Sequence, residues 1–299
     1  MNFPNKKDIF LGLRGKVRRN VPLKKYTTFK IGGAAKFFIE PRDTADLKSL
    51  ISAARRYKIP ILVMGLGSNI LVSDREVKAI VLRLSSPFFR RLRFKKNYLE
   101  AASGAALKEL ILAARERSLG GLEFLTGIPG TVGGALAMNA GAWGESIADL
   151  VENARVMDYN AKIKNLDKKD IKFEYRKSSL AKYIILGVRL KLAKSNKAEI
   201  NNNIRRFLQE RRRRQDTSFP NAGCIFKNTP EAPAGRLIDL CGFKGKRFGG
   251  ACVSARHANF ILNLKNASAD DVLKLMNSIK KTVKNKFKVA LEPEIKIWQ

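Results

Sequence analysis

Two segments in the first half of the chain repeat a helical spacing of apolar residues. They cover residues 44–58 and 105–118, and each places apolar side chains at i, i+3, i+4 and i+7: Leu47, Leu50, Ile51 and Ala54 in the first, and Leu107, Leu110, Ile111 and Ala114 in the second. This spacing puts the apolar residues on one face of a helix. Thr44 is the expected N-cap of the first helix, and Pro60 ends it.

Other stretches predict strands and two later helices. We expect strands at residues 61–64, 79–84 and 291–298 and several within 151–192, where Leu186, Val188 and Leu190 alternate with less apolar residues. The polar segment 194–203 is the expected domain boundary. A helix follows it and ends in the run Arg211–Arg214, and a last helix begins at the cap Ser268, with Asp271 completing a capping box.

Two glycine-rich loops are the main chemical signal. The long loop from 120 to 144 contains Gly127, Gly130, Thr131, Gly133 and Gly134. Glycines allow successive backbone N–H groups to turn toward an anion, and a following helix start adds positive potential. An isolated pair of glycines more often forms a structural turn, whereas four glycines within residues 127–134 favour contact with phosphate.

The second loop, with Gly65, Gly67, Ser68 and Asn69, directly follows a predicted strand. It is not the G-x-G-x-x-G fingerprint, because position 70 is Ile, and it lacks the Gly-Lys-Ser/Thr of a P-loop. Two such loops suit a long ligand with two phosphates held between two subdomains.

Composition narrows the class of protein. The 299 residues carry 59 Lys and Arg against 26 Asp and Glu, a formal charge of +33, which attracts polyanions. The basic residues are spread along the chain, so we interpret most of them as solvated faces. Cys224, Cys241 and Cys252 form no CxxC pair, and His257 is the only histidine, so we expect neither disulfides nor a metal site. Residues 1–15 lack a signal-peptide pattern and no apolar run approaches the roughly 18 residues of a membrane span, so we expect a cytoplasmic protein.

Motifs along nearly the whole chain resemble one enzyme family, the UDP-N-acetylenolpyruvoylglucosamine reductases. They occur in the family's order, at residues 27–33 (TTFKIGG), 65–72 (GLGSNILV), 126–134 (TGIPGTVGG), 138–141 (MNAG), 175–176 (YR), 221–228 (NAGCIFKN), 253–254 (VS), 257–260 (HANF) and 291–295 (LEPEI). The separation of Arg176 from Cys224 leaves no room for the substrate-covering loop of one family variant, so the chain resembles the shorter variant.

The resemblance implies an α+β fold of the vanillyl-alcohol-oxidase type. An FAD-binding domain, residues 1–194, would consist of two subdomains of about 1–85 and 86–194, and residues 195–299 would form an α+β substrate domain. The glycine loops would hold FAD, and NADPH would donate the hydride. The reaction would reduce UDP-N-acetylglucosamine enolpyruvate to UDP-N-acetylmuramate in peptidoglycan synthesis. We expect a monomer.

Three residues match the family's catalytic positions. Arg176 would stabilise the negative charge that develops on the substrate carboxylate, since a guanidinium stays charged and grips a carboxylate as a fork. Glu294 would help to polarise the enolpyruvyl group. Cys224 stands where most relatives have Ser, and a thiol, with a pKa of roughly 8.5, donates a proton more readily than a hydroxyl. The alternatives are a surface arginine, a solvated carboxylate and a cysteine that only packs.

Three more residues match positions near the substrate. Tyr175 and Asn228 would contact it, and Arg214 would face the diphosphate of UDP. Gln215 is followed by Asp216 where relatives have Pro, which puts the backbone near Arg214 in question. The run Arg211–Arg214 also suits a solvated helix end, where cations offset the helix dipole.

Two other functions are compatible with parts of the sequence. An FAD-dependent sugar or alcohol oxidase of the same fold would share the glycine loops, but not the set Arg176, Cys224 and Glu294. A nucleic-acid-binding protein would explain the charge and would need aromatic residues beside the cations. The segment 88–94 (FFRRLRF) comes nearest, although its apolar residues more simply pack on the core as a strand.

Overall fold

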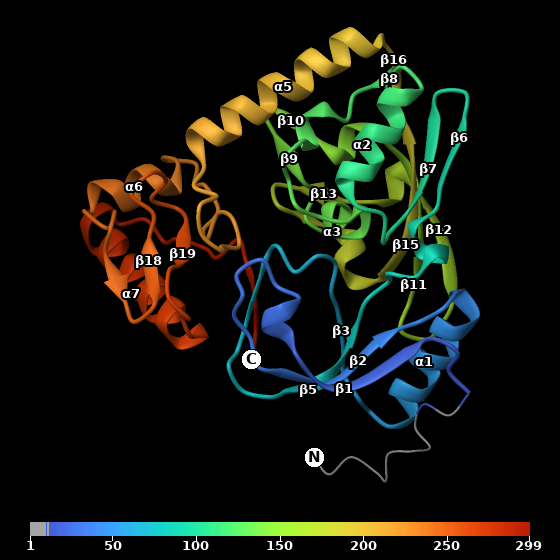
Figure 1. The fold of residues 1–299 in the computed structure, drawn as a ribbon, viewed down its shortest axis with the longest axis horizontal. Coiled ribbons are helices and arrows are strands. Elements are labelled where there is room, and N and C mark those ends of the chain that lie inside the picture. The colour runs from blue at the N-terminus through green and yellow to red at the C-terminus, as the bar shows by residue number, and fades with distance from the viewer. Residues whose placement is uncertain (1–9, 11) are drawn as a thin grey trace. The chain divides into compact units, whose positions relative to one another are not determined.

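The computed structural model describes Phe10 and residues 12–299 and divides them into two compact units (Figure 1). Unit 1 comprises residues up to 19, 36–65 and 78–209, and unit 2 comprises 20–35, 66–77 and 210–299. Most of the N-terminal stretch that we searched for a signal peptide, residues 1–9 and 11, lies outside the described residues. Within the described part of the chain, no helix is long and apolar enough to cross a membrane.

The first layer of unit 1 is a four-stranded sheet covered by helix α1. The strand order is β1 (Lys16–Pro22), β2 (Ala34–Glu40), β5 (Val77–Leu82), β3 (Ile61–Val63). The expected apolar face of α1 (Thr44–Arg56) is buried in one core cluster with Phe37, Ile39 and Ile80. The expected N-cap was wrong by one residue, because Asp43 has the extended backbone and its side chain accepts the Asp46 N–H.

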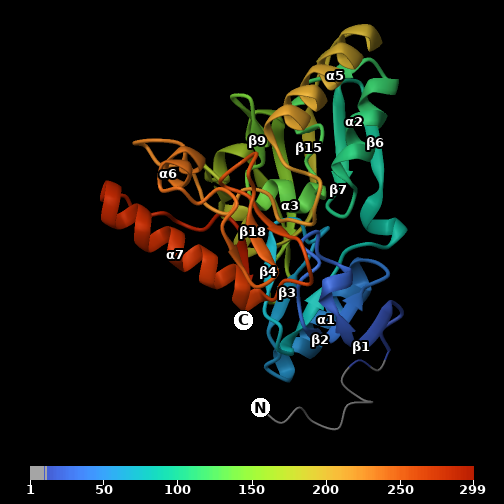
Figure 2. The ribbon, with the colours of Figure 1, turned by 60° about the vertical axis from the view of Figure 1, so that its left-hand side comes forward.

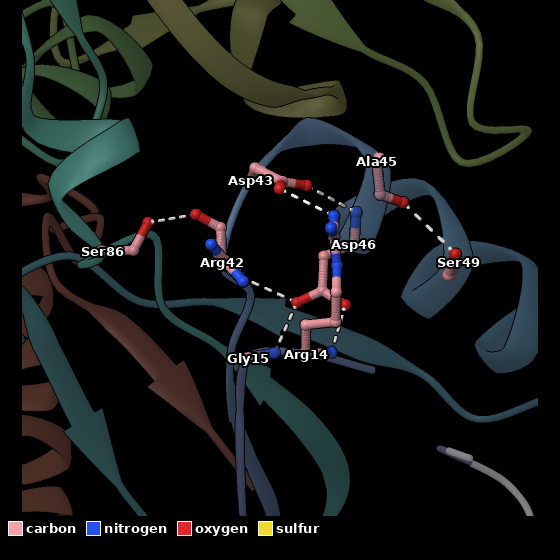
Figure 3. Close-up of polar contacts among 8 residues, drawn as sticks. All are labelled: Arg14, Gly15, Arg42, Asp43, Ala45, Asp46, Ser49 and Ser86. Carbon is pink, nitrogen blue, oxygen red and sulfur yellow. Dashed lines mark hydrogen bonds and ion pairs between the residues drawn. The ribbon is translucent and has the colours of Figure 1, made fainter. Parts of the chain in front are cut away.

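A buried aspartate fastens the start of the described chain to this layer (Figure 3). Asp46 is 3% exposed, and its carboxylate accepts hydrogen bonds from the backbone N–H groups of Arg14, Gly15 and Arg42 at 2.8–2.9 Å. All three donors lie outside α1. One carboxylate therefore replaces the strand partners that these N–H groups lack.

The second layer of unit 1 is a five-stranded antiparallel sheet. Its order is β12 (Ile163–Asp167), β11 (Val151–Met157), β15 (Ile184–Lys191), β7 (Tyr98–Ala102), β6 (Leu92–Lys95). Helices α2 (Leu107–Glu116) and α3 (Val132–Ala137) contribute Leu107, Leu110, Val132 and Leu136 to the core cluster of this sheet. The strands expected within 151–192 and the second helical stripe are thereby confirmed. The segment 88–94 forms a 3-10 turn (Pro87–Arg90) followed by β6, with Phe89 buried, so only its second half is a strand.

The stretch 120–144, expected as one long loop, contains more regular structure than its sequence predicts. It includes part of β8 (Leu119–Gly120), a 3-10 turn (Glu123–Leu125), α3 and β9 (Gly141–Ala142). β8 pairs with β16 (Ala193–Lys194), and β9 pairs with β10 (Glu145–Ser146), which leads into α4 (Ile147–Leu150). Elements this short have no periodicity, so only their partners reveal them.

Unit 2 is built from three separated stretches of the chain. Phe29, Ile31 and Leu71 from the first half are buried in one cluster with C-terminal residues such as Phe226 and Ile295. The C-terminal stretch supplies α6 (Ala234–Leu240), α7 (Ala269–Phe287) and a three-stranded antiparallel sheet of β17 (Arg247–Phe248), β18 (Ala251–Val253) and β19 (Ile261–Asn263) (Figure 2). The predicted capping box of Ser268 and Asp271 at the start of α7 is present, with hydrogen bonds of 3.0 Å.

The last expected strand is shorter than predicted. Only β20 (Lys296–Trp298) is regular, and it pairs in parallel with β4 (Ile70–Val72) within unit 2. Before it, Pro293 makes an isolated bridge with Phe226. Residues 292–294 nevertheless remain paired to the segment that contains Cys224, as described below.

Helix α5 (Lys197–Arg214) begins inside the polar segment that we expected to be a domain boundary. Its residues up to Gln209 belong to unit 1, and those from Glu210 belong to unit 2. The compact units therefore follow a different division of the chain from the domains expected from the family resemblance.

Candidate active site

The first glycine loop leads directly into α3 in unit 1. Thr131 is the N-cap, and its Oγ1 accepts the N–H of Gly134 at 3.3 Å. The N–H of Gly133 donates to the Ser103 carbonyl at 2.8 Å. Ser103 is 4% exposed, and its hydroxyl has no hydrogen-bond partner among the described residues. The N–H groups of Val132, Gly133 and Gly134 thus already donate within the chain, and the buried Ser103 hydroxyl is a group that a phosphate or ribose oxygen of a nucleotide would satisfy.

The second glycine loop touches the first through Gly65. A Cβ at Gly65 would lie 2.7 Å from Thr131 Oγ1, and both residues belong to unit 1. In unit 2, Gly67 has φ +66°, and a Cβ there would lie 2.2 Å from the Tyr26 carbonyl oxygen, so this turn accepts only glycine. The structure thus brings together parts of both loops that sequence reasoning assigned to one cofactor.

The second loop is also tied to the C-terminal segment within unit 2. Asn69 Nδ2 donates to the Glu294 carbonyl at 3.3 Å, and the Lys296 N–H donates to the Asn69 carbonyl at 2.9 Å. The side chain of a predicted cofactor residue is therefore bonded to the backbone of the predicted catalytic glutamate. Ser68 lies in the same turn.

Arg176 lies at the tip of a tight hairpin in unit 1. The hairpin consists of β13 (Phe173–Glu174) and β14 (Lys177–Ser178), and Arg176 has φ +56°, a strained backbone region for a residue other than glycine. Its Nη1 donates to the Gly141 carbonyl at 2.9 Å, and its guanidinium lies 5.2 Å from the Tyr175 ring centre. Tyr175 itself is 53% exposed.

The hairpin is held against the end of α3. Ser178 Oγ donates to the Leu136 carbonyl at 2.7 Å, and Asn139 Nδ2 donates to the Glu174 carbonyl at 3.1 Å. The element that begins with the glycine loop therefore also fixes the hairpin that presents Arg176.

Cys224 and Glu294 lie on neighbouring extended segments of unit 2. Cys224 is partly buried and forms a bridge with Phe260, and the Glu294 N–H donates to the Ile225 carbonyl at 2.8 Å. Glu292, the other acidic residue of this segment, is exposed and pairs with Lys227 at 2.9 Å. The structure thus places Glu294, and not Glu292, beside the residue that follows Cys224.

The residues expected near the substrate have other contacts in the structure. Arg214 ends α5, with a side chain 58% exposed and its Nε 2.9 Å from Glu210. Asn228 is exposed, and its Oδ1 accepts the N–H of Ala234, the first residue of α6, at 3.1 Å. Neither contact tests substrate binding.

Asp216 follows α5 at the position where we questioned the backbone near Arg214. Its carboxylate accepts hydrogen bonds from the hydroxyls of Ser218 and of Ser254, which is fully buried. These two bonds, led by that from Ser218, hold the pKa of Asp216 below its usual value. The Ser254 hydroxyl in turn accepts the N–H groups of Arg256 and His257 at 3.1 Å. Side-chain hydrogen bonds thus order the segment after α5 in this chain.

A cavity in unit 1 lies apart from the predicted residues. It has a volume of about 240 Å³, and its lining includes Glu123, Glu145, Arg206 and Phe207. Burial raises the pKa of Glu145, with a smaller contribution from Glu123. None of the predicted site residues lines this cavity, and no group of His, Cys, Asp or Glu in the described chain could hold a metal ion.

Sequence reasoning missed two residues of the candidate site. Ser103 lies at the end of β7 and carries the unsatisfied hydroxyl described above. Asn259, within the HANF motif, is 2% exposed and bonds the backbone next to Cys224. The motif was recognised, but only the fold shows which backbone its asparagine holds.

Comparison with known proteins decides the family. The model of the UDP-N-acetylenolpyruvoylglucosamine reductase C-terminal domain matches residues 215–298, and that of an FAD binding domain matches residues 35–167. UDP-N-acetylenolpyruvoylglucosamine reductase 2 of Symbiobacterium thermophilum is 42% identical over 95% of this chain and 92% of its own length. The reductase of Caldanaerobacter subterraneus is 41% identical over 95% and 94%.

The chain belongs to the UDP-N-acetylenolpyruvoylglucosamine reductase family. The crystal structure of the reductase from Thermus caldophilus agrees, with a TM-score of 0.82 and 36% identity over 96% of this chain and all of that one. A solvent-stable cholesterol oxidase shares the fold alone, with a TM-score of 0.50 and 15% identity over 60% of this chain and 38% of its own.

Family membership confirms the expected α+β fold of the vanillyl-alcohol-oxidase type and the expected enzyme class. The chain is an FAD-dependent oxidoreductase. Between Lys177 and Arg214 the chain forms β14, a 3-10 turn, β15, β16 and α5, consistent with the shorter form of the family's reductases.

Proposed function

We propose that the enzyme reduces the enolpyruvyl ether of UDP-N-acetylglucosamine enolpyruvate to the lactyl ether of UDP-N-acetylmuramate, with NADPH as reductant, in the cytoplasm. The observation that carries this proposal is similarity over more than nine-tenths of the chain to relatives named for the reductase activity. The motif residues Arg176, Cys224 and Glu294 support it.

The proposed division of labour follows the family resemblance. Residues 1–194 hold FAD, with the two glycine loops on its phosphates and Ser103 as an added donor. Residues 195–299 bind the UDP-sugar, with Arg214 on its diphosphate and Asn228 at another of its groups, and Tyr175 of the FAD-binding domain contacts the substrate as well. Bound FAD supplies the hydride that reaches the terminal carbon of the vinyl group.

Residues of the chain then stabilise the negative charge that develops on the substrate and donate the proton. The Arg176 guanidinium binds the substrate carboxylate, where negative charge builds as the double bond is reduced. Glu294 polarises the enolpyruvyl group. The Cys224 thiol gives its proton to the carbon next to the carboxylate, which completes the lactyl ether, and the thiolate regains a proton from solvent.

The deciding experiment measures NADPH oxidation with and without UDP-N-acetylglucosamine enolpyruvate. We expect a yellow protein whose NADPH consumption depends on the enolpyruvyl sugar and yields UDP-N-acetylmuramate in equal amount. UDP-N-acetylglucosamine, which lacks the vinyl group, is the matched control and should give no turnover.

Three other outcomes would each reject the proposal. A colourless protein that stays inactive with added FAD would exclude the flavoenzyme. Flavin that stays covalently attached after denaturation, with alcohol-dependent oxygen consumption, would indicate an oxidase. Salt-sensitive DNA binding without flavin would indicate a nucleic-acid-binding protein. Light scattering on the same sample tests the proposed monomer.

A further inference from the structure

Asn259 makes three hydrogen bonds to two consecutive residues of the segment that carries Cys224. Its carbonyl accepts the Ile225 N–H at 2.9 Å, its Oδ1 accepts the Phe226 N–H at 2.9 Å, and its Nδ2 donates to the Phe226 carbonyl at 2.8 Å. Asn259, Ile225 and Phe226 are all at least 97% buried. The amide side chain thus continues the strand pairing by bonding both polar groups of one residue.

The opposite side of this segment is bonded to the chain around Glu294. The Glu294 N–H donates to the Ile225 carbonyl at 2.8 Å, and the Lys227 N–H donates to the Glu292 carbonyl at 2.9 Å. Residues 225–227 therefore lie between Asn259 on one side and residues 292–294 on the other, all within unit 2. Phe226, which Asn259 holds, is thus next to Ile225, which follows Cys224 and accepts the Glu294 N–H.

We propose that Asn259 is a positioning residue for catalysis, which sets the separation of Cys224 and Glu294 through the backbone of residues 225–226. The proposal rests on the proposed function for its kinetic consequence, but the placement of Cys224 can be measured without the reaction. Buried amide pairs of this kind are costly to break, because both backbone groups lose their partners.

The chain contains a matched control for this residue. Asn263 is also buried, with 7% of its surface exposed, and both ends of its side-chain amide also bond the backbone. Its Nδ2 donates to the Phe29 carbonyl at 3.0 Å, and its Oδ1 accepts the Ala267 N–H at 2.8 Å. Its bonds do not reach residues 224–226 or 292–294. Asn259→Asp and Asn263→Asp each replace one buried donor to a carbonyl by an acceptor, so a purely structural effect should be similar in both.

The kinetic test separates the two half-reactions in the FAD-loaded enzyme. Asn259→Asp should slow the oxidation of reduced enzyme by UDP-N-acetylglucosamine enolpyruvate about ten- to a hundredfold, the scale of a small misplacement of a reacting group, and leave reduction by NADPH unchanged. Asn263→Asp should leave both rates within about twofold. Equal slowing by the two Asp variants would overturn the proposal.

A second measurement does not depend on the reaction. The rate of Cys224 alkylation by iodoacetamide, followed by mass spectrometry of the peptide, should change at least about threefold in Asn259→Asp and stay at the wild-type value in Asn263→Asp. Asn259→Ser serves if the Asp variant does not fold. Unchanged alkylation in every folded Asn259 variant would reject the positioning role, whereas changed alkylation in an enzyme inactive on the enolpyruvyl sugar would reject only the proposed function.

Discussion

At the scale of single residues, the most informative position is Cys224, where the family resemblance leads us to expect serine. A thiol is a stronger acid than a hydroxyl, so the exchange keeps a proton donor and eases its ionisation. The structure places this residue beside the segment that bonds Glu294. This placement suits a proton donor, and replacement of the side chain distinguishes that role from packing alone.

Replacement of Cys224 separates proton donation from packing. Cys224→Ser should remain active, because the hydroxyl can still donate, while Cys224→Ala should lose reduction of the enolpyruvyl sugar and keep NADPH-driven flavin reduction. Stopped-flow absorbance of the flavin measures both steps. Cys241→Ser is the control, since that cysteine ends α6 and has no predicted role. Normal sugar reduction by the Ala variant would remove Cys224 from the mechanism.

Arg176 should matter for charge stabilisation and not for cofactor binding. Arg176→Ala is expected to lower kcat about a hundred- to a thousandfold, the usual effect of removing one donor to a developing anion, with FAD still bound. Lys177→Ala, at the next residue with an exposed side chain, should have no effect. Steady-state kinetics and the flavin content of the purified variants give the answer. Loss of flavin together with activity would instead make Arg176 a structural residue.

At the scale of secondary structure, periodicity predicted the long elements and missed the short ones. The helices α1, α2 and α7 follow from apolar spacing because each buries one broad face. The strands β8, β9 and β10 have two residues each and exist only through pairing with a partner. The N-cap of α1 moved from Thr44 to Asp43 because both residue types can cap, and only the backbone geometry distinguishes them.

Replacement of Asp46 measures how much its hydrogen bonds to the chain before the first strand stabilise the fold. Asp46→Ala leaves three N–H groups, those of Arg14, Gly15 and Arg42, without their acceptor, which should lower the free energy of unfolding by about 3 to 5 kcal/mol. Asp43→Ala, which removes a helix cap and a partly exposed ion pair with Arg14, should cost about 1 to 2 kcal/mol. Urea unfolding followed by circular dichroism compares the two. Similar losses of unfolding free energy in the two variants would show that the Asp46 carboxylate contributes no more than the helix cap.

At the scale of the whole molecule, the sequence predicted the family but not the way the chain is shared between two compact units. The motifs at 27–33 and 65–72 identified the reductase, yet nothing in their pattern shows that Phe29, Ile31 and Leu71 are buried with C-terminal residues. Such packing depends on contacts between residues about 200 positions apart. The spacing of apolar residues within a short segment predicts helices and strands but not these contacts. The candidate site shows the same limit, since the family supplied Cys224 and Glu294 and the fold supplied Asn259.

The charge of +33 has a consequence for stability that does not depend on any single site. Even if every one of the 26 acidic residues paired with a cation, 33 of the 59 basic residues would stay uncompensated, and their mutual repulsion opposes compaction. Salt weakens exposed ion pairs such as Lys274–Asp270, but each pair stabilises the fold by less than about 1 kcal/mol. The stabilisation gained by screening the repulsion should therefore exceed the loss from weaker ion pairs.

The thermal midpoint should therefore rise as NaCl increases from about 0.02 to about 0.5 M, over which the screening length falls from about 20 Å to less than 5 Å. The measurement is made on the enzyme with FAD in excess, so that weaker binding of the anionic cofactor at high salt does not lower the midpoint. KCl at equal ionic strength is the control for a sodium-specific site, because screening depends on ionic strength and not on which of the two cations is present. A midpoint that falls with both salts would mean that the ion pairs of this surface outweigh its repulsion, and that its basic residues lie far enough apart to be harmless.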